Sequence, residues 1–285
     1  MDRELRIGTA GWAIPRAVAE DFPSLGSGLE RYAARFDCAE INSSFHRRHR
    51  RGVYERWRGA TPPGFRFAVK APKTVTHAQR LVDSAGLLAD FLEEVSGLEE
   101  KLGPVLFQLP PSLAFDPAVA ESFLRLWRDL YPGDTVWEPR HPTWFEPEAE
   151  LLLAMFRVAR VAADPARTPV ADLPAGWPGI AYFRLHGSPR MYATPYGPER
   201  LEPLAGSISQ LPAPTWVMFD NTMSGAAAQD ARLLIELAKL ATDLQRPGEG
   251  LGQDRQDAAE GFYGETFSSA DAAFCSTRMG LGPFL

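Results

Sequence analysis

Charged and polar side chains stand at or just after the ends of most short apolar runs in this sequence. Carboxylates and imidazoles can exchange protons near neutral pH, and lysine and arginine can hold anions. The residues that we single out are Glu40 and Asn42, then Lys70, His77 and Gln108, then Glu138, Arg140 and His141, then Arg184 and His186, and finally Asn221, which follows Asp220. Their types predict a polar pocket that binds an anion and moves a proton.

The spacing of these residues suits a shared pocket. In "WEPRH", Glu138 and Arg140 are two residues apart, so a strand directs both to the same face. The same period places Glu40 with Asn42, and Arg184 with His186. Asp220 and its neighbour Asn221 cannot both point inward, and we expect one of them to cap a helix that begins near Ser224.

The elements that must position these side chains form a repeating pattern. Apolar runs alternate with segments of helical period, which favours βα units and a parallel sheet. The runs are 5–12, 38–45, 65–72, 104–111, 135–141, 158–165, 180–187 and 216–222. Eight such strands predict a closed (β/α)8 TIM barrel, whose functional sites lie at the carboxyl ends of the strands.

The helical segments are less regular than the strands. Apolar residues recur at helical spacing over 29–36, 84–102, 119–130, 146–156 and 224–244. The connection 166–178 is too rich in proline for a full helix, and 188–214 is expected to hold a short one near Glu199–Ser209. An open doubly wound sheet is the alternative architecture. It is disfavoured because no GxGxxG turn follows the first strand.

Composition narrows the class of protein. The 285 residues carry a net charge of -6, which argues against a general nucleic-acid binder. Cys38 and Cys275 stand far apart, as in proteins of a reducing cytosol, and we find no apolar stretch long enough to span a membrane. We expect a cytoplasmic protein with a barrel over 1–244 and an irregular tail over 245–285, either disordered or docked on the barrel. Its oligomeric state stays open.

Five histidines lie at or after predicted strand ends, which raises the question of a metal. No HxH, HExxH or HxxxH pair occurs on one element, and basic neighbours would repel a cation. We therefore favour a metal-free anion site without a cofactor over a site for a divalent metal.

Residues 46–51, HRRHRR, form a basic run directly after the second predicted strand. At the mouth of a barrel such a run could steer anions toward a pocket. The equally good alternative is a solvated loop whose arginines pair with nearby acids. An arm that binds nucleic acid ranks third.

Seven motifs occur in an order that resembles the DUF72 family, also called YecE-like proteins. They are GTAGW, EINSSFH, FAVKAP followed by TH at 76–77, LGPVLFQLPP, WEPRHPTW, YFRLHG and FDNTMSGAAAQDA. The resemblance covers about residues 7–231 and implies a TIM barrel without an established activity. It departs at His46, where the family often has tyrosine, and at Asp220, where the family often has asparagine.

The leading hypothesis is a metal-independent enzyme that acts on a small anionic substrate, either phosphorylated or sugar-derived. Its reaction could be a hydrolysis, an elimination or an isomerisation. Two alternatives stay open: a non-catalytic barrel that binds an anionic metabolite, and a protein that uses residues 46–51 on nucleic acid. The expected roles are anion binding by Arg140, Arg184 and Lys70, acid–base work by Glu138 or Glu40 with His186 or His141, and further substrate contacts from Gln108, Asn42, His77 and Asn221.

Overall fold

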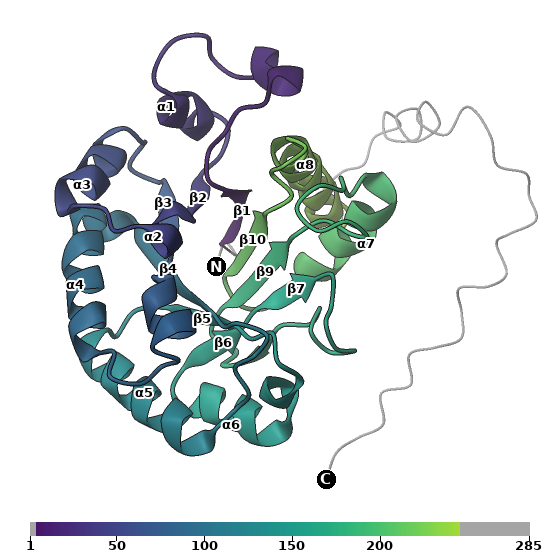
Figure 1. Cartoon of the computed structure of the whole chain (residues 1–285). Helices are drawn as coiled ribbons and strands as arrows, with labels where there is room; N and C mark the ends of the chain where they lie inside the picture. The colour runs from purple at the N-terminus through teal and green to yellow at the C-terminus, as the bar shows by residue number, and fades with distance from the viewer. Residues whose placement is uncertain (1–3, 246–285) are drawn as a thin grey trace, which may run out of the picture. The chain divides into compact units, whose positions relative to one another are not determined.

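A ring of strands surrounded by helices makes up the part of the protein that the computed structural model describes, residues 4–245 (Figure 1). Within this part the strands pair in the order β7-β9-β10-β1-β2-β3-β4-β5-β6-β8. Their bounds are β1 Leu5–Ala10, β2 Cys38–Ile41, β3 Arg66–Lys70, β4 Leu102–Gln108, β5 Thr135–Glu138, β6 Val158–Arg160, β7 Ala162–Asp164, β8 Ala175–Gly176, β9 Ala181–Leu185 and β10 Thr215–Phe219.

The ring closes through β6 and β7, which follow each other along the chain on either side of Val161. β6 pairs in parallel with β5, and β7 pairs in parallel with β9. These two short strands therefore occupy one position of the barrel, and the eight predicted apolar runs supply its eight positions. The TIM barrel prediction is confirmed. β8 is an antiparallel addition beside β6, inside the proline-rich connection that we expected to lack a full helix.

Helices cover the outside of the ring, as Figure 1 shows for α3 to α8. The short helix predicted near Glu199–Ser209 is present as α7, and the last helix begins at Ala227 instead of near Ser224. The α-helices are α1 Gly28–Ala33, α2 Ser43–His46, α3 Arg51–Gly59, α4 Ala85–Val95, α5 Pro117–Leu130, α6 Pro147–Met155, α7 Pro198–Ile208 and α8 Ala227–Gln245. Short 3-10 helices η1 Arg16–Asp21, η3 Ser96–Lys101 and η4 Pro142–Phe145 and a π-helix η2 Thr74–Ala78 complete the connections.

Local sequence signals explain where two of the outer helices begin. The Ser27 hydroxyl accepts from the backbone N–H of Glu30, and the Glu30 carboxylate accepts from the backbone N–H of Ser27, a capping box at α1. Asp116 caps α5, where Pro117 takes the first helical position.

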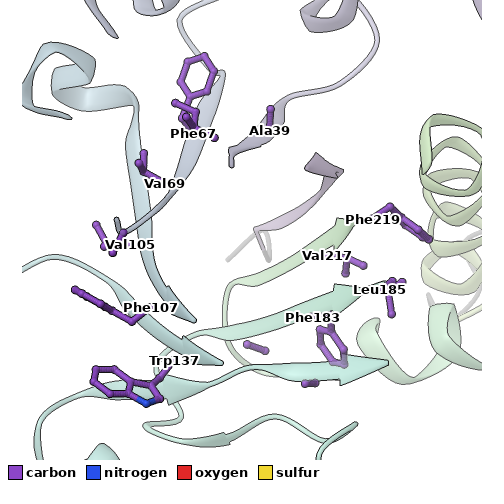
Figure 2. Packing of buried hydrophobic residues seen from close by; sticks show 14 of the residues in the cluster. Ala39, Phe67, Val69, Val105, Phe107, Trp137, Phe183, Leu185, Val217 and Phe219 are labelled. Atoms are coloured by element: carbon purple, nitrogen blue, oxygen red, sulfur yellow. The ribbon is translucent and has the colours of Figure 1, made fainter. Parts of the chain in front are cut away.

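Alternate residues of each strand face two different cores. Those that face the helices include Phe107, Trp137 and Phe219, and Figure 2 shows their side chains on the outer side of the strands. Those that face inward form a second cluster with Leu106 and Trp216 inside the ring. Because side chains alternate along a strand, the positions two residues beyond the inner apolar layer must also face inward. Those positions hold five of the predicted site residues.

The predicted tail, 245–285, lies outside the described residues apart from Gln245, so the domain boundary stays a prediction. No helix of residues 4–245 is long and apolar enough to cross a membrane. The cytoplasmic location also stays a prediction.

Candidate functional site

The polar layer at the carboxyl ends of the strands is built on the apolar interior of the barrel. Cys38, Ala68, Leu106, Val136 and Tyr182 belong to that interior. Two residues further along each of these strands stand Glu40, Lys70, Gln108, Glu138 and Arg184, all of them buried. The strand period therefore brings five predicted residues into one layer.

Arg184 is the centre of this layer. Its Nε and Nη2 donate to the two Glu40 carboxylate oxygens at 3.0 and 2.6 Å. Its Nη1 donates to Glu138 Oε2 at 2.6 Å, and Nη2 also donates to Asp220 Oδ2 at 2.9 Å. Four of its five N–H groups are thus engaged by three carboxylates, and the side chain is 0% exposed. We had expected Arg184 to hold an anion, but it has no free surface for one.

His186 lies between two of the same carboxylates. Its Nδ1 is 3.0 Å from Asp220 Oδ2, and its Nε2 is 3.2 Å from Glu138 Oε1. A protonated imidazole donates from both nitrogens, so this arrangement suits the imidazolium. The edge of the Tyr192 ring packs on the imidazole, with the ring centroids 5.7 Å apart.

Neighbouring side chains complete the hydrogen bonding of the carboxylates. Gln108 Nε2 donates to Glu138 Oε1 at 3.0 Å, and Arg140 Nε and Nη2 donate to the same oxygen at 3.2 and 3.1 Å. The Tyr182 hydroxyl donates to Glu40 Oε2 at 2.8 Å. These contacts satisfy the carboxylate oxygens and hold them in position.

Burial and neighbouring charges shift the pKa values of Glu138, Asp220 and His186 in different directions. Burial alone would raise the pKa of Glu138, but Arg184, then His186 and Arg140, hold it well below the usual range. Asp220 follows the same logic: burial opposes ionisation, and Arg184 and His186 lower its pKa. Burial works against a charged His186, yet Glu138 is the main cause that raises its pKa. The resting cluster therefore consists of carboxylates and a protonated imidazole.

Lys70 enters the same layer without hydrogen bonds. Its side chain is buried, and Nζ lies 4.2 Å from the centroid of the Phe45 ring. No described residue accepts a hydrogen bond from Nζ, and Nζ is not one of the polar atoms sealed from solvent without a partner. Burial, with a smaller contribution from Arg184, lowers the pKa of Lys70 to about 8. Lys70 thus presents an amine to the solvent at the mouth.

A π-helix places His77 against the same Phe45 ring that Lys70 contacts. Single π-turns are rare and frequently occur at functional sites. The turn at Thr74–Ala78 buries Thr76, whose hydroxyl lies 2.8 Å from His77 Nδ1, and leaves His77 exposed against the edge of Phe45. Burial lowers the pKa of His77, and the charges of Lys70 and Arg140 lower it further. His77 is therefore a neutral imidazole close to both cations.

Asn42 belongs to this layer as well. Its Nδ2 donates to Asp220 Oδ1 at 3.4 Å, and its Oδ1 is buried without a partner in the described part of the chain. This oxygen has almost no solvent-accessible surface, so a bound molecule cannot reach it in this arrangement.

Two predicted residues lie apart from the cluster. His141 Nδ1 accepts from the Thr143 backbone N–H at 3.3 Å and caps the turn after β5. Asn221 points out of the ring and donates to Asp230 Oδ2 at 2.7 Å and to the Thr194 carbonyl at 3.1 Å. Asn221 thus meets a side chain in the first turn of α8, and not the backbone N–H groups that a cap would satisfy.

Sequence reasoning left four residues of the site out of its selection. Asp220 is the inward member of its pair, and the two-residue period from Met218 could have identified it. Tyr182 reaches the cluster from the inner layer, Phe45 from α2 and Tyr192 from the loop after β9. Only the tertiary contacts of the last two reveal them.

Metal ligation has no built site in residues 4–245, where no group of three or more His, Cys, Asp or Glu side chains is arranged to hold an ion. In the cluster, Arg184 and Arg140 occupy the space around the carboxylates that a cation would need. The expectation of a site without a metal or cofactor stays a prediction.

The basic run 46–51 is partly neutralised. Arg48 pairs with Glu94 at 2.5 Å and with Asp90 at 2.8 Å, and Arg51 pairs with Glu55 at 3.0 Å. His49 is buried, and its Nε2 lies 2.8 Å from the Ser43 hydroxyl. The run therefore offers less free positive charge than its sequence suggests.

Comparison with known proteins agrees with this architecture. A family model described as "Protein of unknown function DUF72" matches residues 6–251. The chain belongs to the DUF72 family. The UPF0759 protein YecE of Escherichia coli K12 is 34% identical over 143 residues, 49% of each chain. The UPF0759 protein YunF of Bacillus subtilis is 30% identical over 149 residues, 50% of this chain and 52% of its own. The matched part thus spans about half the length of these relatives.

Solved structures of DUF72 proteins share the fold. A DUF72 family protein of Enterococcus faecalis V583 superposes with a TM-score of 0.69 at 18% identity, over 87% of this chain and 100% of that one. A DUF72 family protein of Thermotoga maritima MSB8 gives 0.68 at 24% identity, over 83% and 99%. At these identities the likeness supports the barrel alone, so the chemistry of this DUF72 chain has to be argued from its own side chains.

Proposed function

We propose that this DUF72 protein is an enzyme that acts on a small anionic substrate at the carboxyl ends of its barrel strands. The observation that carries the proposal is the convergence of charged residues from β2, β3, β5, β9 and the end of β10 on one layer, in which the Lys70 amine makes no hydrogen bond within the described chain. Known TIM-barrel enzymes place their sites at this end.

The charges of the layer favour an anion. Glu40, Glu138 and Asp220 supply three carboxylates, and they face Arg184, Arg140, Lys70 and the protonated His186. One positive charge is thus in excess, and it lies where a ligand can reach it. Lys70 Nζ has no hydrogen bond in the described chain, and Arg140 donates from Nε and Nη2 to Glu138 and also interacts with the Tyr192 hydroxyl. Charge-assisted hydrogen bonds from these two donors are the natural means of holding a phosphate or carboxylate.

His186 and the two carboxylates beside it, Glu138 and Asp220, are the groups that transfer protons in this proposal. Glu138 is too acidic to act as a general base by itself, because Arg184 stabilises its ionised form. His186 holds a proton that it shares with Glu138 and with Asp220. Asp220 is the more exposed of these two carboxylates, with 11% of its side chain exposed against 2% for Glu138. Asp220 therefore provides the route by which a proton reaches a substrate.

A non-catalytic barrel that binds an anionic metabolite is the second candidate. The saturated hydrogen bonding of Arg184 favours it, because buried charges that satisfy one another can serve the fold alone. Under this alternative Lys70 and Arg140 bind the ligand, and no bond is made or broken.

Calorimetric titration with inorganic phosphate tests the anion site. We expect Lys70→Met and Arg140→Met each to weaken phosphate binding at least tenfold. Lys239→Met is the matched control, because Lys239 is an exposed lysine on the outer helix α8. Equal phosphate affinity in all four proteins would contradict both candidate functions.

Turnover separates the two candidates. A panel of sugar phosphates and hydroxy acids is incubated with the protein and followed by ³¹P and ¹H NMR. The enzyme proposal expects at least one compound to be converted, with loss of conversion and retention of binding in His186→Gln. A compound that binds in the Lys70-dependent way, with no conversion of any panel member, favours the binding barrel.

A further inference from the structure

We propose that Lys70 is a nucleophile that forms an imine with its substrate, so that the substrate is a small aldehyde or ketone bearing a phosphate or carboxylate. This inference rests on the proposed function and adds the reacting group. It assigns Lys70 and Arg140 different tasks: Lys70 Nζ bonds to the carbonyl carbon, and Arg140 binds the anionic group.

A second buried lysine shows what is unusual about Lys70. Lys101 Nζ donates to the carbonyls of Arg58 and Thr61 at 2.7 and 2.6 Å and to the Thr61 hydroxyl at 3.1 Å. These three acceptors satisfy the N–H groups of Lys101, although burial lowers the pKa of Lys101 as well. Lys70 is equally buried, at 7% against 5% exposed, but finds no acceptor among the residues that the structure describes. An amine that is buried along its stem and unbonded at its tip is free to react.

The surroundings of Lys70 keep part of the amine uncharged. Burial is the largest cause of its lowered pKa, and the Arg184 guanidinium adds to it, against the opposing effect of Glu138, Glu40 and Asp220. With a pKa of about 8, about a tenth of Lys70 is the neutral amine at pH 7 and about half at pH 8. An ordinary lysine has less than about a thousandth in that form at pH 7. Desolvated lysines of this kind act as nucleophiles toward carbonyls.

The chemistry balances with groups already present. The lone pair of the neutral amine adds to the carbonyl carbon, and the C=O electron pair moves to oxygen. The proton that the nitrogen of this adduct loses is passed on to that oxygen, which gives the neutral carbinolamine. The C–O bond then breaks as one further proton reaches the leaving hydroxyl, and water departs from the iminium. One carbonyl group, one amine and one proton become one iminium and one water, so no oxidant or reductant is consumed.

Neighbouring groups suit each proton transfer. His77 is a neutral imidazole, and no described residue contacts its Nε2 by a hydrogen bond, so that nitrogen can accept the proton that the adduct loses. The pair of His186 and Asp220 can protonate the leaving hydroxyl. The positive iminium takes the place of the Lys70 ammonium, and the three carboxylates of the cluster stabilise it in the same way.

Pyridoxal 5′-phosphate is a suitable probe, because it is an anionic aldehyde whose imine absorbs visible light. The full chain is titrated with it at about pH 8, the imine is reduced with borohydride, and the labelled lysine is located by peptide mass mapping. We expect a single saturable label at Lys70, lost in Lys70→Met and retained in Lys101→Met and Lys239→Met. Thermal unfolding of every variant checks that it is folded. The rate of labelling should rise with a midpoint near pH 8.

Pyridoxal without the phosphate separates the tasks of the two cations. Arg140→Met should raise the concentration of pyridoxal 5′-phosphate needed for half-labelling at least tenfold and leave that of pyridoxal within about twofold. If Arg140→Met affects both aldehydes equally, the anionic group is not bound as proposed.

The failure of this inference can be told apart from the failure of the proposed function. Label spread over exposed lysines such as Lys73 and Lys239, and unchanged in Lys70→Met, overturns the imine. If inorganic phosphate binding still depends on Lys70 and Arg140 in that case, the anion site stands without the imine. If neither phosphate nor the aldehyde depends on them, both proposals fall.

Discussion

Arg184 and Lys70 occupy the same inner layer of the barrel and carry the same kind of charge, yet the protein uses them in opposite ways. Arg184 is 0% exposed and donates to three carboxylates, whereas Lys70 is 7% exposed and donates to none. A guanidinium cannot lose its proton in a protein, so burying it requires carboxylate partners. An amine can lose its proton, so it can be buried with its tip unpaired. The residue type therefore explains why one cation is saturated with partners and the other is left unpaired.

The strongest way to break this comparison is Arg184→Met. The substitution leaves Glu40, Glu138 and Asp220 buried without their shared partner, and we expect it to lower the free energy of unfolding by about 3–5 kcal/mol. Urea denaturation measures this loss. Arg140→Met is the matched variant, because 14% of the Arg140 side chain is exposed and it serves one carboxylate only. Equal losses in the two variants would show that Arg184 is not the centre of the cluster.

The pH dependence of stability tests Lys70 next. Its pKa is about 8 in the folded protein, against a reference of 10.5, so the unfolded chain binds more protons between these values. The free energy of unfolding contributed by Lys70 should therefore rise with pH across this window, by on the order of 3 kcal/mol.

The measurement is the difference between wild type and Lys70→Met in urea denaturation from about pH 7 to pH 10.5. Taking the difference cancels the titration of other groups. A difference that stays flat over this range would mean that Lys70 has an ordinary pKa and is not the reactive partner in the comparison.

Tyr182→Phe tests one of the hydrogen bonds that satisfy the carboxylate partners of Arg184. The Tyr182 hydroxyl donates to Glu40 Oε2 at 2.8 Å in the interior, and removing it should cost about 2 kcal/mol, in the range for hydrogen bonds to charged groups. Thermal and urea unfolding measure the loss. Tyr131→Phe provides the control, since the Tyr131 hydroxyl makes a single partly buried bond of 3.5 Å. A loss no larger than that of the control would mean that Glu40 does not depend on Tyr182.

Arg51→Ala should give the smallest loss of stability among these variants. Arg51 and Glu55 form an exposed pair one helical turn apart at 3.0 Å, and such pairs contribute about 0.3–0.5 kcal/mol, less at high salt. Urea denaturation at low and high ionic strength measures it. If Arg51→Ala lowered the free energy of unfolding nearly as much as Arg184→Met, the contribution of the cluster to stability would not depend on burial of its charges.

The barrel itself could be predicted from local patterns. Eight apolar runs, their alternation with helical segments and the proline content of 166–178 were enough, because strand and helix periods are properties of neighbouring residues. The split of the sixth run at Val161 was not visible. It depends on β5 and β9 each taking one half of that run as a partner.

The site divides in the same way. Sequence alone determined which residues face inward, since Glu40, Lys70, Gln108, Glu138 and Arg184 each stand two positions past an inner apolar residue. It could not determine which of these charges would satisfy one another. That outcome depends on distances between strands far apart in the chain, and these placed Arg184 among three carboxylates and left the amine of Lys70 over the Phe45 ring. The two-residue period of each strand decided which side chains face inward. The closure of the barrel decided which charges pair, because electrostatic energy depends on separation in space.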